Sequence, residues 1–326
     1  MKVLVTGGNG FIGSHLVDEL LKRGADVYCL VRKGSDSRFL NAMKATLIHG
    51  DLTQKDLLAK VVSEKDCVYH LSGVKRAKLD QTYYGVNHIG TKNLVEACVQ
   101  YNPQIKKFIF VSSLAACGPS PDGHLIKEDE QCLPITHYGK SKLQGEQAVL
   151  KWKDKIPVVI VRPPVVYGPR DRDLLSYFRW INRGVGIFIG EGKSLLSFCY
   201  VQDLISGMLM AEEHPDSNGQ VYFIANEQTY SWNAVAECIA DCLGKQLFNI
   251  HFPRLVALFL SFSMETFSFF SRKSVILNRE KILEASQPYW VCDVSKAKKM
   301  LGFQSVFNLE EGIEHTVQWY RREAWL

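Results

Sequence analysis

The sequence predicts an α/β fold, a doubly wound parallel sheet with a smaller C-terminal lobe. Three observations support this class: apolar strand-like runs alternate with amphipathic helical patterns in the first half, a glycine-rich turn joins the first strand to the first helix, and the alternation becomes irregular after Pro163-Pro164. Alternating strands and helices form right-handed β-α-β units, and helices then cover both faces of the parallel sheet.

Hydrophobic periodicity places six strands and four helices in the first half. We expect strands at Val3–Thr6, Asp26–Val31, Ala45–His49, Cys67–Leu71, Phe108–Ser112 and Val158–Arg162. We expect helices at Phe11–Arg23, Lys55–Ser63, Asn87–Tyr101 and Tyr138–Lys153. A sheet of this kind binds its ligand at the carboxyl ends of the strands, near the point where the strand order reverses.

The second half is less regular. Glycine-rich turns at residues 184–192 precede an apolar run at 198–201, a helix from about Asp203 to Glu213 and a strand at Val221–Ala225. We expect a nucleotide-binding domain at residues 1–165, with residues 195–225 returning to it. Residues 166–194 and 226–326 would then form most of the substrate-binding lobe, without a clean boundary.

Composition narrows the function classes. With 326 residues, 46% of them hydrophobic and 22% charged, the chain can form a substantial globular core. Its net charge of +5 comes from interspersed basic residues, which argues against a nucleic-acid partner. Nine cysteines without a Cys-x-x-Cys pair favour buried thiols over a metal site or a disulfide framework. Because a strand begins at residue 2, we expect no signal peptide and a cytoplasmic location.

The first turn predicts a Rossmann-type dinucleotide site. Its sequence is Gly7-Gly8-Asn9-Gly10-Phe11-Ile12-Gly13. Gly7 allows the tight turn, Gly10 lets the backbone approach a pyrophosphate, and Gly13 lets helix and strand pack closely. The N–H groups of the following helix would bind the phosphate. We expect the intervening residues of the turn, Asn9, Phe11 and Ile12, to line the same site.

The end of the second strand bears on the choice of cofactor. A site that prefers NAD usually has an Asp or Glu there to hold the ribose hydroxyls. Here Val31 is followed by Arg32 and Lys33, and a guanidinium matches a 2′-phosphate in geometry and charge. The sequence therefore favours NADP(H), with NAD(H) as the alternative. The other interpretation of Arg32 is an ordinary exposed loop arginine.

The next two strand ends complete the predicted cofactor site. Asp51 and Leu52 close the third strand, where the carboxylate can accept a hydrogen bond from the adenine amino group. Asp51 can equally cap the turn before the next helix. Leu71, Ser72 and Gly73 follow the fourth strand, where small residues would line the cofactor.

Tyr138 and Lys142 are four residues apart on one predicted helix and share a face. A phenol has an ordinary pKa near 10, and a neighbouring ammonium stabilises the phenolate that proton transfer requires. We expect Tyr138 to exchange a proton with a substrate oxygen, while Lys142 assists it and holds the nicotinamide ribose. Ser112 or Ser113, at the end of the fifth strand, would bind the substrate carbonyl; either can instead cap the chain leaving the strand.

Together with these motifs, three further segments resemble the extended (atypical) short-chain dehydrogenase/reductase superfamily, which includes the NAD-dependent epimerase/dehydratase family. The segments are Asn87–Leu94, Arg162–Pro169 and Tyr200–Leu204. The resemblance spans nearly the whole chain. It implies that Tyr138, Lys142 and Ser113, which lies five residues before Gly118, are the catalytic residues.

The same resemblance implies further roles. Asn87 matches a helix asparagine that fixes a kink or a proton-relay water, although an interior polar role explains it equally well. Pro163 and Val166 are expected at the cofactor. Cys117 stands where many relatives carry tyrosine, which alters the pocket wall. Relatives often pair through helices at the positions of Asn87–Tyr101 and Tyr138–Lys153, so we expect a homodimer.

The resemblance is closest to the dihydroflavonol-reductase-like and 3β-hydroxysteroid-dehydrogenase-like branch. Nucleotide-sugar enzymes of the superfamily usually carry an arginine at the position of Leu196, and sugar dehydratases an Asp-Glu pair that this chain lacks. Val31-Arg32 resembles an NADP-selecting pair. We therefore expect interconversion of a ketone and a secondary alcohol on a small hydrophobic, sterol- or lipid-like substrate. A nucleotide-sugar epimerase or dehydratase with a recycled cofactor and a non-catalytic NADP-sensing scaffold are the alternatives.

An apolar stretch at residues 255–270 resembles the C-terminal helix of the steroid dehydrogenases. At about 16 residues, interrupted by Glu265, it is too short to cross a bilayer. Packing on the core or on a dimer partner is the first interpretation. Lining an apolar substrate pocket and peripheral contact with a membrane surface are the others.

Overall fold

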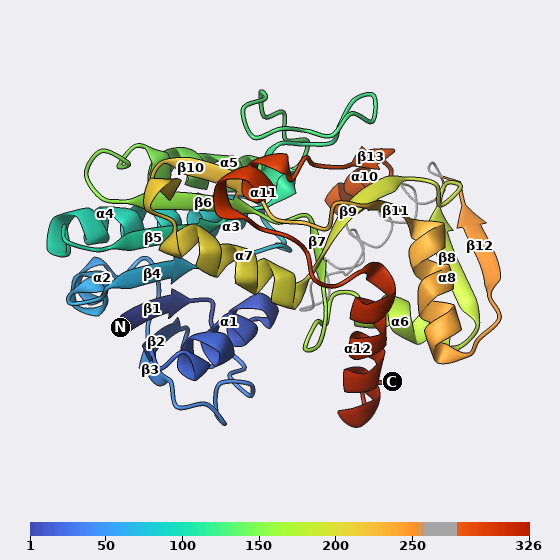
Figure 1. Ribbon diagram of the computed structural model, residues 1–326, viewed down its shortest axis with the longest axis horizontal. Coiled ribbons are helices and arrows are strands. Elements are labelled where there is room, and N and C mark those ends of the chain that lie inside the picture. The colour runs from blue at the N-terminus through green and yellow to red at the C-terminus, as the bar shows by residue number, and fades with distance from the viewer. Residues whose placement is uncertain (254–255, 257–278) are drawn as a thin grey trace.

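A computed structural model describes residues 1–253, 256 and 279–326 of the chain. Seven parallel strands form the large sheet, in the order β10-β6-β5-β4-β1-β2-β3, which fills the left half of Figure 1. The strands are β1 (Lys2–Thr6), β2 (Asp26–Val31), β3 (Thr46–His49), β4 (Cys67–His70), β5 (Lys107–Val111), β6 (Val158–Arg162) and β10 (Gln220–Phe223). The predicted doubly wound α/β fold is confirmed.

Helices cover both faces of this sheet. One layer contains α1 (Phe11–Lys22), α7 (Val201–Glu213) and α11 (Ser295–Leu301); the other contains α2 (Lys55–Val62), α4 (Thr91–Tyr101) and α5 (His137–Leu150). Side chains alternate between the two layers, since Val3 and Val5 pack in the first core and Leu4 in the second. Both faces are buried, which is why β5 and β6 are apolar throughout except for Lys107 at the start of β5 and Arg162 at the end of β6.

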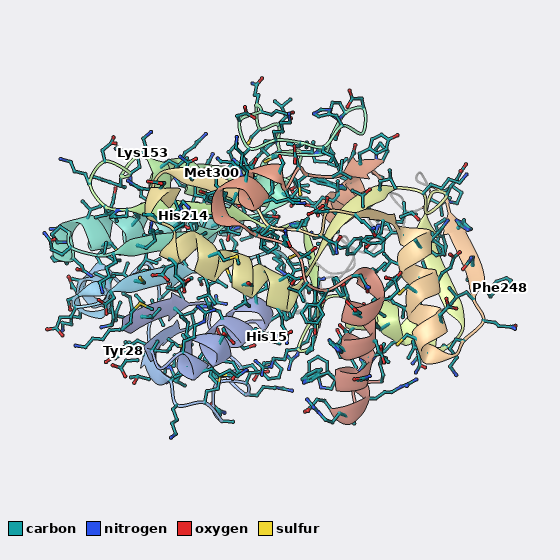
Figure 2. The ribbon with its side chains drawn as sticks, viewed as in Figure 1. His15, Tyr28, Lys153, His214, Phe248 and Met300 are labelled. Atoms are coloured by element: carbon teal, nitrogen blue, oxygen red, sulfur yellow. The ribbon has the colours of Figure 1, made fainter. Side chains whose placement is uncertain are left out.

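The second half of the chain builds smaller sheets, at the right of Figure 1. β9 (Leu195–Tyr200) pairs with β7 (Val165–Tyr167), β11 (Thr229–Ser231) and β13 (Tyr289–Trp290), and β8 (Val185–Ile189) pairs with β12 (Phe248–Phe252). The helices of this part are α6 (Leu175–Asn182), α8 (Trp232–Leu243), α10 (Arg279–Ala285) and α12 (Leu309–Arg322). Phe248 lies at the outer edge, 72% exposed (Figure 2).

The segment 195–225 is divided between the two parts. Helix α7 packs on the large sheet and β10 extends it beside β6, as expected of a returning segment. Strand β9 belongs instead to the smaller sheet. The reason is the pairing of β7, which begins directly after Pro163-Pro164. β7 forms its hydrogen bonds with β9 and not with the large sheet. The division of the chain into two domains stays a prediction.

The predicted helix at residues 87–101 is not one regular helix. A short helix α3 (Asp80–Tyr83) continues into a π-helical segment, η1 (Tyr84–Gly90), and only then into α4. At the junction, the Thr91 hydroxyl donates to the Asn87 carbonyl at 2.7 Å, and the Thr91 N–H bonds to the His88 carbonyl. This side-chain bond substitutes for part of the α-helical ladder, and π segments of this kind are frequent beside functional sites.

No helix within the described ranges is long and apolar enough to span a membrane. Apart from Val256, the stretch 255–270 lies outside the described residues. Its expected roles in the pocket, on the core or at a membrane therefore stay predictions.

Candidate active site

A cavity of about 790 Å³ opens at the carboxyl ends of the large-sheet strands, where β1 lies between β2 and β4 and the chain reverses direction across the sheet. Its walls come from the loops after β1 to β6 and from the smaller sheets. The predicted site residues that line it are Gly7, Asn9, Gly10, Phe11, Ile12, Gly13, Arg32, Asp51, Leu52, Leu71, Ser72, Gly73, Ser113, Tyr138, Lys142, Pro163 and Val166. Lys33 and Asn87 do not line it.

The glycine turn leaves the N-terminus of α1 open to a ligand. Gly7 has a φ of +73°, and the Gly10 N–H donates to its carbonyl at 3.0 Å. A Cβ on Gly13 would lie only 2.1 Å from that same carbonyl oxygen. Among the described residues no side chain caps α1, and its first turn contains no acid. Free N–H groups therefore face the cavity, and they suit the negative charge of a pyrophosphate.

The loop after β2 presents a cation to the cavity. Arg32 and Ser35 line it, and the Ser35 hydroxyl donates to the Arg32 carbonyl at 2.7 Å. Within residues 32–45, all of which the structure describes, no carboxylate lines the cavity. The acid of this loop, Asp36, is ion-paired with Arg38 and Arg172.

Asp51 combines the two roles that the sequence left open. Its carboxylate accepts a hydrogen bond from the Thr53 N–H at 3.0 Å, which closes the turn before α2. The residue also lines the cavity. Because the carboxylate has further lone pairs, the capping bond leaves it able to accept another hydrogen bond.

Tyr138 and Lys142 lie in the first part of α5. Thr136 caps this helix by accepting from the Gly139 N–H at 3.1 Å. Lys142 is buried, and its ammonium donates to the Val111 carbonyl at the end of β5 at 2.7 Å. Burial lowers the pKa of Lys142 to about 7. The helix thus places a phenol and a buried amine on the same wall of the cavity.

Both candidate serines lie beside this helix. The Ser113 hydroxyl accepts from the Ala115 N–H at 3.2 Å, which starts the short helix η2 (Leu114–Ala116). Ser112 also lines the cavity, and its hydroxyl is buried without a hydrogen-bond partner among the described residues. A Cβ on Gly139 would lie 2.2 Å from the Ala115 carbonyl oxygen, so the serine loop and α5 pack in direct contact.

Asn87 lies behind the cavity wall and is hydrogen-bonded to Val74, which lines the cavity. Its amide accepts from the Val74 N–H at 2.8 Å and donates to the Val74 carbonyl at 3.0 Å and to the Ser141 hydroxyl at 2.9 Å. The residue is fully buried, whereas Val74 lines the cavity. Its geometry fits a positioning residue that ties the segment after β4 to α5.

Several charged residues of the cavity were not anticipated. Asp173 pairs with the Lys75 ammonium at 3.1 Å and with the Arg76 guanidinium at 3.2 Å, and the Lys281 ammonium lies 5.6 Å from the centre of the Tyr138 ring. Lys75 and Arg76 follow the predicted Leu71–Gly73 segment after one intervening residue, Val74, so the basic pair was a usable signal. Asp173 and Lys281 come from distant parts of the chain, and no local motif marks them.

Most of the remaining wall beyond Tyr138 is apolar. Its apolar part is formed by Val165, Leu174, Leu196, Trp232, Ala285 and Trp290. These residues belong to β7, β9, α8, α10 and β13 or to the loop before α6. The half of the cavity beyond Tyr138 therefore combines an apolar surface with two groups of ion pairs, that of Asp173 with Lys75 and Arg76 and that of Lys281 with Glu284.

Comparisons with known proteins agree with this geometry. A model of the NAD dependent epimerase/dehydratase family matches residues 3–225. The sterol-4-alpha-carboxylate 3-dehydrogenase, decarboxylating, of Mus musculus is 27% identical, and the alignment covers 97% of this chain and 90% of the relative. The ceramide reductase of Caulobacter vibrioides is 26% identical over 99% of this chain and 96% of its own.

Solved structures show the same fold. The UDP-glucuronic acid 4-epimerase of Bacillus cereus, solved in complex with NAD, has a TM-score of 0.81 and 25% sequence identity, and 99% of each chain is covered. The predicted superfamily and enzyme class are confirmed: the chain is a nicotinamide-dinucleotide-dependent enzyme of the oxidoreductase and epimerase type. It belongs to the NAD dependent epimerase/dehydratase family, within the extended short-chain dehydrogenases/reductases.

Proposed function

We propose that the enzyme interconverts a ketone and a secondary alcohol on a hydrophobic, sterol- or lipid-like substrate, with NADP(H) as its cofactor. The observation that carries this proposal is the apolar wall beyond Tyr138, in which Leu196 replaces the arginine expected of a nucleotide-sugar enzyme. An apolar substrate gains free energy as this wall removes its surface from water. Two relatives are named for a sterol carboxylate and a ceramide, which supports the same substrate class.

The residues present fit a dinucleotide. The uncapped N-terminus of α1 and the close approach allowed by Gly10 suit a pyrophosphate, and the Asp51 carboxylate suits an adenine amino group. When bound, the nicotinamide supplies or accepts a hydride. Tyr138 and Lys142 would hold its ribose. The remaining chemistry is proton transfer and orientation, which the side chains around Tyr138 can perform.

In the reducing direction, the Tyr138 hydroxyl donates its proton to the substrate carbonyl oxygen as that oxygen becomes a hydroxyl. The Ser113 hydroxyl donates a hydrogen bond to the same oxygen and orients the carbonyl. The ammonium of Lys142, one helical turn from Tyr138, stabilises the phenolate that remains. In the oxidising direction, the phenolate takes the proton back.

The preference for NADP(H) rests on Arg32. Its guanidinium borders the cavity at the end of β2, with Ser35 beside it and no carboxylate from residues 32–45 on the wall. A 2′-phosphate would gain charge-assisted hydrogen bonds there. An unphosphorylated ribose would find no acid to bind its hydroxyls, which is the arrangement that NAD sites usually provide.

The cofactor proposal is tested with Arg32→Ala and a matched control, Lys33→Ala, since Lys33 follows directly but does not line the cavity. Loss of hydrogen bonds worth about 1.5–3 kcal/mol should raise the KM for NADPH about 10- to 100-fold. The KM for NADH should stay within about 3-fold, and Lys33→Ala should resemble the wild type. Equal effects on both cofactors would overturn the NADP assignment.

The substrate proposal is tested with a panel of apolar ketones and a matched set of nucleotide sugars. We expect NADPH oxidation with ketones, and a drop in kcat of about 10²- to 10⁴-fold in Tyr138→Phe, which loses the transferable proton. Leu196→Arg should lower kcat/KM for apolar ketones, because it introduces an unpaired charge into the apolar wall. Isomerisation or dehydration of a nucleotide sugar, without net oxidation of the cofactor, would instead support the epimerase alternative.

We also propose a cytoplasmic homodimer that associates through the face of α4 and α5. Ile89, in η1 directly before α4, and Tyr101, at the end of α4, are large apolar side chains that are 43% and 49% exposed. Sedimentation of the wild type should give the mass of two chains. Ile89→Glu should shift it toward one chain, whereas an unchanged dimer would place the interface elsewhere.

A further inference from the structure

Two cysteine thiols meet just outside the cavity. Cys117 lies near the end of the serine loop (residues 113–118) and is buried, while Cys132 lies half-buried in the segment that leads into α5. Their sulfur atoms are 3.6 Å apart. The backbone fastens the two segments at the same place, because the Leu133 N–H donates to the Cys117 carbonyl at 2.6 Å. The pair therefore results from the packing of two loops, one of which contains Ser113 while the other precedes Tyr138.

A buried guanidinium adjoins this pair. Arg162, at the end of β6, donates from Nη2 to the Cys132 sulfur at 3.3 Å. Its Nε and Nη2 also bind the Glu146 carboxylate at 3.0 and 2.6 Å. Its Nη1 is buried without a hydrogen-bond partner among the described residues. The site thus holds a thiol next to a positive charge, which favours its thiolate form.

The two thiols are not equivalent. The hydrogen bond with Cys117 lowers the pKa of Cys132, and the Arg162 charge acts in the same direction, against burial and the Glu146 charge. The same hydrogen bond and burial raise the pKa of Cys117. Cys132 is therefore the more readily ionised of the two thiols. By contrast, burial raises the pKa of Cys238 on α8 to about 12.

We propose that Cys117 and Cys132 are a redox modification site, at which a hydroperoxide produces a reversible disulfide between the serine loop and the segment leading into α5. In the first step, the Cys132 thiolate attacks the peroxide oxygen, the O–O bond breaks, and an alcohol or water leaves after taking up a proton. The Cys117 thiol then attacks the sulfur of the resulting sulfenic acid, gives up its proton, and water leaves. The two thiols lose two electrons, which reduce the peroxide.

The disulfide would change the geometry of the active site. A bonded sulfur pair is about 2.05 Å apart, so the present separation of 3.6 Å has to shrink by about 1.5 Å. Ser113 lies four residues before Cys117, and Tyr138 lies six residues after Cys132. Drawing the two segments together shifts both hydroxyls, and a displacement of about 1 Å can cost about 100-fold in rate. The oxidised enzyme should therefore be slower.

The disulfide itself is tested without any substrate, so this test is independent of the proposed function. The reduced full-length protein is treated with hydrogen peroxide, its free thiols are alkylated, and intact mass and cross-linked peptides are measured. We expect loss of the mass of two hydrogen atoms, a Cys117–Cys132 peptide pair, and reversal by dithiothreitol. Cys132→Ser should abolish the cross-link, whereas Cys238→Ser, the matched half-buried control, should keep it. Over-oxidation of Cys132 without any cross-link would overturn the proposal.

The effect on catalysis is measured next, with the substrate that the enzyme turns over. Peroxide should lower kcat of the wild type about 10-fold or more, and dithiothreitol should restore it. Cys132→Ser should keep its kcat under the same treatment. Undiminished turnover of a preparation shown by mass to carry the disulfide would overturn the link between this site and the active-site geometry.

Discussion

Replacing Gly13 with alanine tests how the glycine turn is built. The added Cβ would lie 2.1 Å from the Gly7 carbonyl oxygen and 2.8 Å from the Gly8 Cα, both backbone atoms that no rotamer change can move away. Contacts of this kind below 3.0 Å are essentially unknown, so the turn and α1 have to separate by about 1 Å. Overpacking of this size costs about 1–3 kcal/mol of unfolding free energy, or roughly 2–6 °C in Tm for a chain of this length.

The same displacement moves the N–H groups that face the phosphate. We expect the Kd for NADPH to rise about 100-fold in Gly13→Ala, because charge-assisted hydrogen bonds depend strongly on distance. Thermal unfolding without cofactor and fluorescence titration with NADPH measure the two effects separately. A Tm within about 1 °C of the wild type together with an unchanged Kd would refute the geometric argument.

Two matched variants separate packing from phosphate contact. In Gly10→Ala the new Cβ meets the Gly7 carbonyl oxygen at 3.2 Å, a contact that a shift of a few tenths of an ångström relieves. The Tm of this variant should therefore be close to that of the wild type. Its affinity for NADPH should nevertheless be lower, because the added methyl group occupies the place where the backbone approaches the phosphate. Lys22→Ala, at the other end of α1, should change neither the free energy of unfolding nor the free energy of NADPH binding by more than a few tenths of a kcal/mol.

Three further outcomes follow from buried polar groups near the cavity. Burial lowers the pKa of His70 to about 3 in the folded protein. Between about pH 6.5 and pH 3, His70 is therefore protonated in the unfolded chain but neutral in the folded one. Stability should then fall by about 2 kcal/mol between about pH 7 and pH 5, and denaturant titrations of His70→Gln should show a weaker dependence. Asn87→Ala leaves the Val74 backbone unpaired and should cost about 2–4 kcal/mol of unfolding free energy, a loss that Asn87→Asp should partly avoid. Because the pKa of Lys142 is about 7 without cofactor, binding of the anionic cofactor at about pH 8 should take up protons. Calorimetry in two buffers of different ionisation enthalpy measures this uptake, and Lys142→Met should show none.

Local patterns were sufficient for the large sheet and the cofactor turn. The predicted bounds of β2 and β6 agree with the structure residue for residue, because each is an apolar run with a charged residue at one end, Asp26 or Arg162. The turn Gly7–Gly13 was recognisable because its three conformational requirements fall within seven consecutive residues. Tyr138 and Lys142 could be paired because a single helix brings them to one face.

Other features had no local signature. The π-helical segment at Tyr84–Gly90 depends on side-chain bonds of Asn87 to Val74 and of Thr91 to the Asn87 carbonyl, which periodicity does not reveal. The ion pairs of Asp173 with Lys75 and Arg76 join residues about a hundred positions apart. The approach of Cys117 and Cys132 likewise follows from the packing of two loops.

By itself, the sequence determined the fold class, the glycine turn, the Tyr138-Lys142 pair and the cation at the end of β2. These depend on hydrophobic periodicity and on short spacings, which act within one element or one turn. Only the tertiary structure decided which charges and apolar groups share the substrate side of the cavity and which thiols meet beside it. The apolar neighbours come from β7, β9, α8 and α10, and the ion pairs of Asp173 and the two thiols come from separate loops. Their proximity results from long-range packing, which no local spacing encodes.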